Sequence, residues 1–224
     1  MKKILLGIGG VLGVAVIGIL GAASMQPADF HIERDVTVSA TPADVFPYLN
    51  DYDKWDAWNP WGKMDPNMTV AKSDQKAGVG AWNTWKGNSD VGEGKMTITE
   101  SVENEKTVHR LEFLAPMKAT NTITWSVAAT GDASKVVWAM DGHNDLMGKV
   151  FAMFMDMDSM VGKDFERGLG NLKGLTEADA KARVEAERVA AEAAAAAVVD
   201  PNAPVDPNAP AAVPPAPAMT AGVQ

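Results

Sequence analysis

The sequence predicts an α+β domain in which an antiparallel sheet of about seven strands covers one side of a long C-terminal helix. Residues 151–173 repeat apolar side chains at steps of three and four, which places these side chains along one side of a helix. The members of this stripe are Phe151, Phe154, Val161, Phe165, Leu169 and Leu172. Upstream, several short segments alternate apolar and polar residues, as half-buried strands do. A helix that follows such a sheet buries its apolar side against it.

The first part of the domain combines a strand with two short helices. Residues 30–39 are apolar at every second position over most of their length, which predicts a strand. Thr41, Pro42 and Asp44 then match a helix start, with a capping threonine, a proline in the first turn and an acidic residue closing a capping box. Residues 51–61 contain three tryptophans and a proline, and they predict a short helix followed by a tight turn.

Six further strand candidates follow in close succession, separated by glycine and asparagine turns. Short consecutive strands joined by tight turns form an antiparallel meander, because a parallel connection needs a longer crossover. The candidates are residues 68–73, 81–86, 95–102, 107–114, 120–129 and 135–142.

The N-terminus predicts a membrane segment. Residues 4–25 form a run of 22 residues without a charge, and such a run spans about 33 Å as a helix, enough to cross a bilayer. Lys2 and Lys3 precede it, so we expect a single-pass anchor in a bacterial inner membrane, with a cytoplasmic N-terminus and a periplasmic domain. The alternative is a signal peptide cleaved near the small residues 21–24, which releases the protein into the periplasm.

The C-terminal region changes character after residue 173. Thr176 is a candidate cap for a separate helix over residues 176–199, whose apolar residues are mostly alanine and predict a helix that projects into solvent. Residues 200–224 repeat the motif VDPNAP and are rich in proline and alanine, which predicts a disordered tail. The expected organisation is therefore a membrane segment over 1–25, a folded domain over 26–175, a helix over 176–199 and a tail over 200–224.

Composition excludes several classes of function. A net charge of −9 argues against an extended basic face for nucleic acid. The absence of cysteine excludes disulfides, thiolate metal sites and a cysteine nucleophile. The histidines are His31, His109 and His143, and their spacing matches no metal motif, so we expect no metal and no cofactor. We expect His31 and His109 to lie on the solvated faces of their strands, while Asp141 and His143 offer a possible acid–base pair without a neighbouring nucleophile.

Several local patterns occur in order along residues 30–174. They are Thr41-Pro42 through Phe46, Trp55, Trp58-Asn59-Pro60-Trp61, Gly78-Val79-Gly80-Ala81, Trp85-Lys86-Gly87-Asn88, Val91-Gly92-Glu93-Gly94-Lys95-Met96, Met160-Val161-Gly162-Lys163-Asp164-Phe165-Glu166, Gly168-Leu169 and Leu172-Lys173. In their order and spacing these patterns resemble the SRPBCC superfamily, whose START and birch-pollen-allergen-like members share the helix-grip fold. Within it, the chain is similar to the polyketide cyclase/dehydrase-type branch.

The resemblance implies a curved sheet that grips the long helix, with an apolar cavity between them. Members of the superfamily bind lipids, sterols, polyketides or other hydrophobic molecules there, and some catalyse cyclisation or aromatisation. The chain also has seven tryptophans and thirteen methionines, which suit a deformable aromatic-walled pocket, although large residues at strand and helix periods also fill ordinary cores. The predicted ligand-binding residues are Trp58, Trp61, Trp82, Trp85, Met96, Phe113, Trp125, Trp138, Met140, Phe151, Phe154 and Met155.

Two segments have alternative interpretations. Trp58, Pro60 and Trp61 form either one lip of the pocket or a clamp that fixes the short helices to the sheet. Residues 146–155 form either a mobile lid hinged at Gly148 or the first turn of the long helix.

Three functions fit these observations. The first is a membrane-tethered domain that binds a hydrophobic small molecule or lipid. The second is an enzyme of the cyclase or aromatase kind, which requires polar residues converging on the cavity. The third is an envelope protein-interaction domain that uses the sheet surface or the tail, with no particular protein partner indicated.

Overall fold

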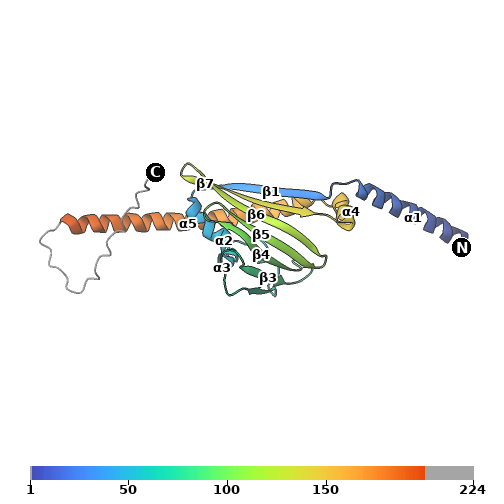
Figure 1. The fold of residues 1–224 in the computed structure, drawn as a ribbon, viewed down its shortest axis with the longest axis horizontal. Helices are drawn as coiled ribbons and strands as arrows, with labels where there is room; N and C mark the ends of the chain where they lie inside the picture. Colours follow the sequence, from blue (N-terminus) through green and yellow to red (C-terminus); the bar gives the residue numbers. More distant parts are fainter. Residues whose placement is uncertain (1, 200–224) are drawn as a thin grey trace, which may run out of the picture. The chain divides into compact units, whose positions relative to one another are not determined.

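The computed structural model describes residues 2–199, with side chains from residue 13 to residue 196 (Figure 1). Two compact units divide the chain, Met1–Arg183 and Val184–Gln224. The first unit holds every strand of the described residues and is the domain considered below. The predicted tail over 200–224 lies outside the described residues.

One antiparallel sheet of seven strands dominates the described part of the chain (Figure 1). The strand order is β1-β7-β6-β5-β4-β3-β2, so β2 to β7 form the predicted meander and β1 pairs with its last strand. The strands are β1 (Asp29–Val38), β2 (Thr69–Lys72), β3 (Trp82–Lys86), β4 (Glu93–Val102), β5 (Lys106–Ala115), β6 (Ala119–Thr130) and β7 (Ala133–His143). The predicted α+β class and meander are confirmed.

Five helices accompany the sheet in residues 2–199. They are α1 (Lys2–Ser24), α2 (Pro42–Asn50), α3 (Tyr52–Trp55), α4 (Leu146–Phe154) and α5 (Met157–Val199). The capping box predicted at the start of α2 is present: the Thr41 side chain accepts from the Asp44 amide, and Asp44 accepts from the Thr41 amide. Among the helices searched over the described residues, none is both long enough and apolar enough to span a membrane.

The helix predicted over residues 151–173 is interrupted. Met155 is extended, with φ −128° and ψ 128°, and Asp156 accepts a hydrogen bond from the Ser159 amide at the start of α5. Phe151 and Phe154 therefore belong to α4, where they are exposed, and only the later part of the stripe is buried. The apolar spacing continues across this break, so the periodicity alone did not reveal it. Residues 146–154 are accordingly the separate helix α4, which ends before Met155, and not the first turn of α5.

The predicted helix boundary at residue 176 was also wrong. Thr176 is fully buried inside a continuous α5, and its hydroxyl donates to the Leu172 carbonyl instead of capping a new helix. Beyond it, Asp179 accepts from the Tyr48 hydroxyl and Arg183 pairs with Asp44 of α2 at 2.9 Å. The first two turns of the segment expected to project into solvent thus pack on the domain, because polar side chains make contacts that an alanine count does not predict.

The first half of α5 lies very close to the sheet. Phe165 stacks on Trp138 of β7 with ring centroids 4.1 Å apart and an interplanar angle of 12°. A Cβ atom at Gly168, one turn later, would lie 2.7 Å from the Trp138 ring and 3.2 Å from Pro60. Glycine at this position is therefore required for the close approach between helix and sheet.

At the same end of α5, Arg34 of β1 crosses to the helix. Its guanidinium group binds Asp158 at 2.9 Å and Glu166 at 3.0 Å, and a Cβ atom at Gly162 would overlap with it. The hydrogen bond to Asp158 is the largest influence on the pKa of Arg34 and outweighs desolvation, so the pKa is raised. This pair of contacts fixes the rotation of α5 about its own axis.

Replacing Gly168 tests the close approach. We expect Gly168→Ala to lower the free energy of unfolding by about 1–3 kcal/mol, as overpacking in a rigid core does. Gly170→Ala is the matched control two residues away, where an added Cβ meets no atom within 4 Å. Because alanine favours helix, the control should raise stability by about 0.5–1 kcal/mol. Chemical denaturation measures both, and equal effects of the two substitutions would contradict the packing argument.

Candidate ligand-binding cavity

A cavity of about 1210 Å³ lies between the inner face of the sheet and α5. Residues of the loop between α3 and β2 close one side, and side chains of β3 to β7 form the floor. This volume exceeds the usual range of about 300–1,000 Å³ for small-molecule pockets. Close-packed interiors leave few voids larger than a water molecule, so this space is the candidate site for a bound molecule.

The floor of the cavity follows from strand register. Asn121 of β6 pairs with Leu111 of β5, Leu111 with Met96 of β4, and Met96 with Asn83 of β3. Side chains directly opposite each other on neighbouring strands point to the same face, so these four form one row across the sheet. All four are buried and line the cavity.

Aromatic rings form the wall at one end of this floor. Trp125 and Trp138 face each other across β6 and β7 with centroids 5.2 Å apart. Trp55 and Trp61 each lie 5.8 Å from Trp138, with edge-to-face geometry. Tilted and edge-to-face pairs are the favoured arrangements of such rings. The cluster is therefore a rigid boundary, and the open space lies beside it.

Trp61 is held at the cavity by a polar contact to α5. Its indole N–H donates to Asp164 Oδ2 at 2.9 Å, and Asp164 also binds Arg167. Trp61, Asp164 and Arg167 all border the cavity. A hydrogen bond to a charged acceptor contributes about 1.5–3 kcal/mol. This bond therefore helps to hold the Trp61 indole in its position beside α5.

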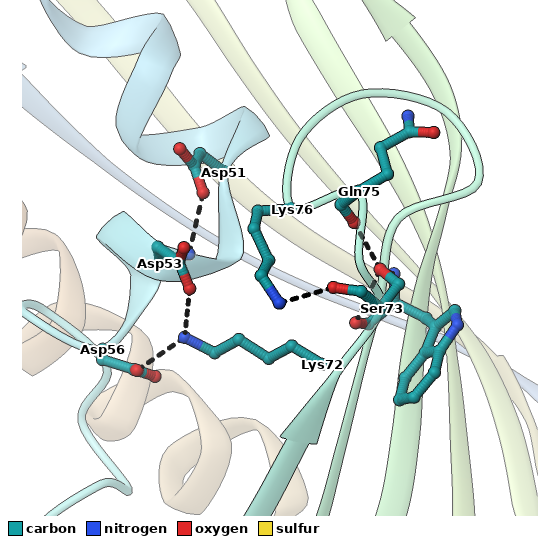
Figure 2. Close-up of polar contacts among 8 residues, drawn as sticks. Asp51, Asp53, Asp56, Lys72, Ser73, Gln75 and Lys76 are labelled. Carbon is teal, nitrogen blue, oxygen red and sulfur yellow. Dashed lines mark hydrogen bonds and ion pairs between the residues drawn. The ribbon is translucent and has the colours of Figure 1, made fainter.

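A second polar cluster holds the start of the loop that closes the cavity (Figure 2). Lys72 of β2 binds Asp56 at 2.7 Å and Asp53 at 3.0 Å. Burial lowers the pKa of Lys72, but the hydrogen bonds to the two carboxylates outweigh it and leave the pKa raised. The adjacent Lys76 donates to the Ser73 carbonyl at 2.6 Å. The two contacts of Lys72 attach α3 and Asp56 to the edge strand of the sheet.

Seven of the twelve predicted site residues line the cavity. These are Trp61, Trp85, Met96, Phe113, Trp125, Trp138 and Met140. Trp85 and Phe113 pack edge to face at 6.0 Å, and the Trp85 indole donates to the Val91 carbonyl. A Cβ at Gly94 would overlap with the Trp85 ring, so the glycine of the Gly92-Glu93-Gly94 motif gives this tryptophan its space.

The other five predicted residues lie elsewhere. Trp58 is fully buried in the core and donates to the Tyr48 carbonyl at 3.1 Å, so it is the clamp and not a lip. Trp82 has the opposite strand phase to Asn83 and lies under the Lys95 ammonium group on the outer face. The remaining three lie on α4 and at its end, before α5 begins, and do not border the cavity. These three are Phe151, Phe154 and Met155.

Sequence reasoning missed several lining residues. Leu111 and Ile123 occupy the same strand faces as Phe113 and Trp125, so strand alternation was sufficient to find them. The sequence pattern does not mark Asn83 and Asn121 as lining residues, because polar residues on strands are usually solvated. Phe165 was assigned to the helix stripe, and it borders the cavity as well as contacting Trp138.

His109 is buried, contrary to the prediction that it is solvated. It shares the inward face of β5 with Thr107 and Leu111, and its Nδ1 lies 2.8 Å from the Tyr52 hydroxyl. Its Nε2 has no hydrogen-bond partner in the described structure. Burial lowers the pKa of His109 to about 3, against an opposing influence of the Leu49 carbonyl. The imidazole is therefore neutral in the folded protein at physiological pH.

The possible acid–base pair of Asp141 and His143 does not form. Asp141 binds His31 at 2.7 Å, and His143 binds Asp29 at 2.8 Å, across β1 and β7. His31 is solvated as predicted, and both pairs are exposed on the face opposite the cavity. Within the described residues, no group of acidic or histidine side chains could hold a metal ion.

The family of the chain follows from its sequence. The model of the family described as "Polyketide cyclase / dehydrase and lipid transport" matches residues 29–177, about two thirds of the chain. The chain belongs to this polyketide cyclase/dehydrase family. The match covers the whole sheet and the part of α5 that borders the cavity, and it confirms the resemblance to the SRPBCC superfamily. No curated protein matches the sequence.

Solved structures of low sequence identity share the fold of this family member. A hypothetical protein from Helicobacter pylori, jhp0584, aligns with a TM-score of 0.52 and 12% identity, covering 66% of this chain and 89% of that chain. The di-domain aromatase/cyclase StfQ from the steffimycin biosynthetic pathway aligns with a TM-score of 0.51 and 11% identity. That alignment covers 69% of this chain and 52% of StfQ.

Acid should destabilise the protein through His109. Its folded pKa lies below the ordinary value of 6.5, so below about pH 6.5 the unfolded chain binds a proton that the folded chain does not. The contribution of neutral His109 to the free energy of unfolding is fully present above that pH. It is lost as the pH falls toward 3, by up to about 1.4 kcal/mol per pH unit. Denaturation curves between pH 7 and pH 4 should show a smaller loss in His109→Asn, which keeps a polar partner for Tyr52.

His31 is a control whose contribution to stability depends on pH in the opposite direction. Its hydrogen bond to Asp141 raises the pKa of His31 despite some desolvation, so its contribution is present below pH 6.5 and is lost as the pH rises through its folded pKa. His31→Gln should therefore leave the acid loss intact or slightly steeper. Parallel pH profiles for wild type and His109→Asn would contradict the role of His109.

Proposed function

We propose that this domain binds a hydrophobic small molecule or lipid in the cavity between the sheet and α5. The observation that carries the proposal is a cavity of about 1210 Å³ whose walls include tryptophan, methionine, leucine and phenylalanine, with polar and charged side chains also bordering it. Burial of about 200 Å² of a ligand's apolar surface is worth about 5 kcal/mol at 25 cal/mol per Å². That gain is offset in part by the lost freedom of the ligand, which a pre-formed pocket reduces.

A catalytic role in cyclisation or aromatisation is the second candidate, favoured by the buried amides of Asn83 and Asn121 on the cavity floor. Amides can position a substrate carbonyl, but proton transfer needs a titrating group. Asp65 borders the cavity, yet its two carboxylate oxygens accept the backbone N–H groups of Asn67 and Asn88. This commitment of Asp65 to the loops makes it a poor general base, and Asp164 is likewise engaged by Trp61 and Arg167.

Filling the cavity tests the proposed function. We expect Leu111→Trp to reduce binding of the apolar dye Nile red at least tenfold, because the larger ring occupies the middle of the floor. The matched control is Arg110→Trp, the next residue on the same strand, whose side chain lies on the outer face in an exposed pair with Glu112. It should bind as wild type does. Fluorescence titration measures both, with mass spectrometry of co-purified lipid as an independent readout. Equal binding by both variants would contradict a ligand in this cavity.

We further propose that the N-terminal segment anchors the domain to a bacterial inner membrane, with the domain periplasmic. Two observations support this location: the charge-free run over residues 4–25 and the apolar surface of α4, which contacts α1. α4 has no buried residue and a single charge, Lys149, while Phe151 and Phe154 are exposed. Exposed apolar surface of this kind favours a membrane or protein neighbour over water.

Fractionation of cells that express the full chain tests the location. We expect the protein in the membrane fraction after high-salt and alkaline washes, because a spanning helix is held by apolar burial and not by charge. Intact mass distinguishes the alternatives: an anchored chain keeps its full 23.7 kDa, and a cleaved signal peptide leaves a shorter chain in the periplasmic extract. Recovery of full-length protein in the soluble fraction would contradict both.

A further inference from the structure

Asn83 is a buried amide without a full set of partners. It is 6% exposed on β3, it borders the cavity, and its Oδ1 atom has no hydrogen-bond partner in the described structure. An unpaired buried polar atom costs about 1–3 kcal/mol. An apolar side chain at this position would avoid that cost. The Oδ1 atom is itself out of contact with solvent, so a guest in the cavity pairs with it only after the side chain rotates.

Asn121 is the second amide of the same row, 8% exposed on β6. Its Nδ2 atom lies 3.8 Å from the Met140 sulfur, which is a weak acceptor. The adjacent position on β7 is Gly142, where a Cβ atom would overlap with the Asn121 side chain and with the Phe30 ring. The absence of a side chain at Gly142 therefore leaves room for Asn121 on the cavity floor.

The two amides are separated by apolar side chains. Leu111 and Met96 lie between them in the register, so three strand spacings, about 14 Å in total, separate their backbones. An amide offers both a donor and an acceptor. The floor is thus polar at two separated points and apolar in the middle.

Of the charged side chains that border the cavity, Asp164 pairs with Arg167, Asp65 accepts two backbone N–H groups, and Lys63 and Asp90 are exposed to solvent. Lys72, next to Asn83 in the register, is paired with Asp53 and Asp56. A buried charge without a partner is far more costly than a neutral polar group. Hydroxyl, carbonyl and carboxamide groups match the amides without that cost.

We infer that the ligand is an elongated apolar molecule with an uncharged hydrogen-bonding group near each end, one meeting Asn83 and the other Asn121. This inference rests on the proposed function, since it specifies the chemistry of a guest in the same cavity. The apolar middle of the ligand lies over Leu111 and Met96, and the aromatic wall bounds one side.

The test compares terminal alkanediols of increasing chain length with the 1-alkanols of the same lengths, by displacement of Nile red from the full-length protein. Wild type should prefer one intermediate diol over its alkanol by about tenfold, the value of one hydrogen bond of ordinary strength. Asn83→Leu and Asn121→Leu should each abolish that preference while still binding the alkanol.

Asn171→Leu is the matched control. Asn171 also borders the cavity, but its amide already donates to the Trp58 carbonyl at 3.2 Å, so this variant should keep the diol preference. Circular dichroism establishes that each variant is folded before it is titrated.

The outcomes separate the two proposals. If alkanols and diols bind equally well and neither Asn83→Leu nor Asn121→Leu changes their ratio, the cavity binds apolar guests and the two-ended recognition is wrong. If neither Nile red nor any member of either series binds to the folded wild type, the proposed function itself fails. A preference for diols that the Asn171 variant also loses would likewise overturn the assignment to Asn83 and Asn121.

Discussion

The contact between Phe165 of α5 and Trp138 of β7 is the constraint on which the rest of the domain depends. The two rings stack at 4.1 Å, and Gly168 allows the helix backbone to approach the same tryptophan. Arg34 fixes the same helix from β1 through Asp158 and Glu166. A helix held this tightly cannot also settle onto the whole sheet, because a straight rod meets a twisted surface along a limited line.

The space left over becomes the cavity. α2 contacts β5 and β6. The Tyr52 hydroxyl is hydrogen-bonded to His109, and the Thr107 hydroxyl donates to the Leu49 carbonyl, so these contacts join the short helices to β5. Further along the sheet, one row of side chains faces the cavity instead of the short helices. This row consists of Asn121, Leu111, Met96 and Asn83. The same sheet therefore supplies a rigid aromatic core at one end and a ligand-sized space at the other.

The polar contacts around the cavity define its edges. Lys72 attaches the α3 end of the closing loop to β2, and Asp65 accepts backbone N–H groups from residues on both sides of the β2–β3 hairpin. Trp61 is joined to α5 through Asp164.

The sequence by itself determined the order of the elements, because strand alternation, the Thr41 capping box and the glycine turns are local properties of the chain. It also determined the family and seven of the side chains that line the cavity. Six of these are large apolar residues on strands, and the seventh, Trp61, lies in the tryptophan-rich segment after α3. Only the tertiary structure decided where the long helix breaks, because Asp156 interrupts a periodicity that continues across it. Only the tertiary structure placed His109 and the two asparagines inside, since the burial of a polar side chain depends on partners and neighbours far away in the chain.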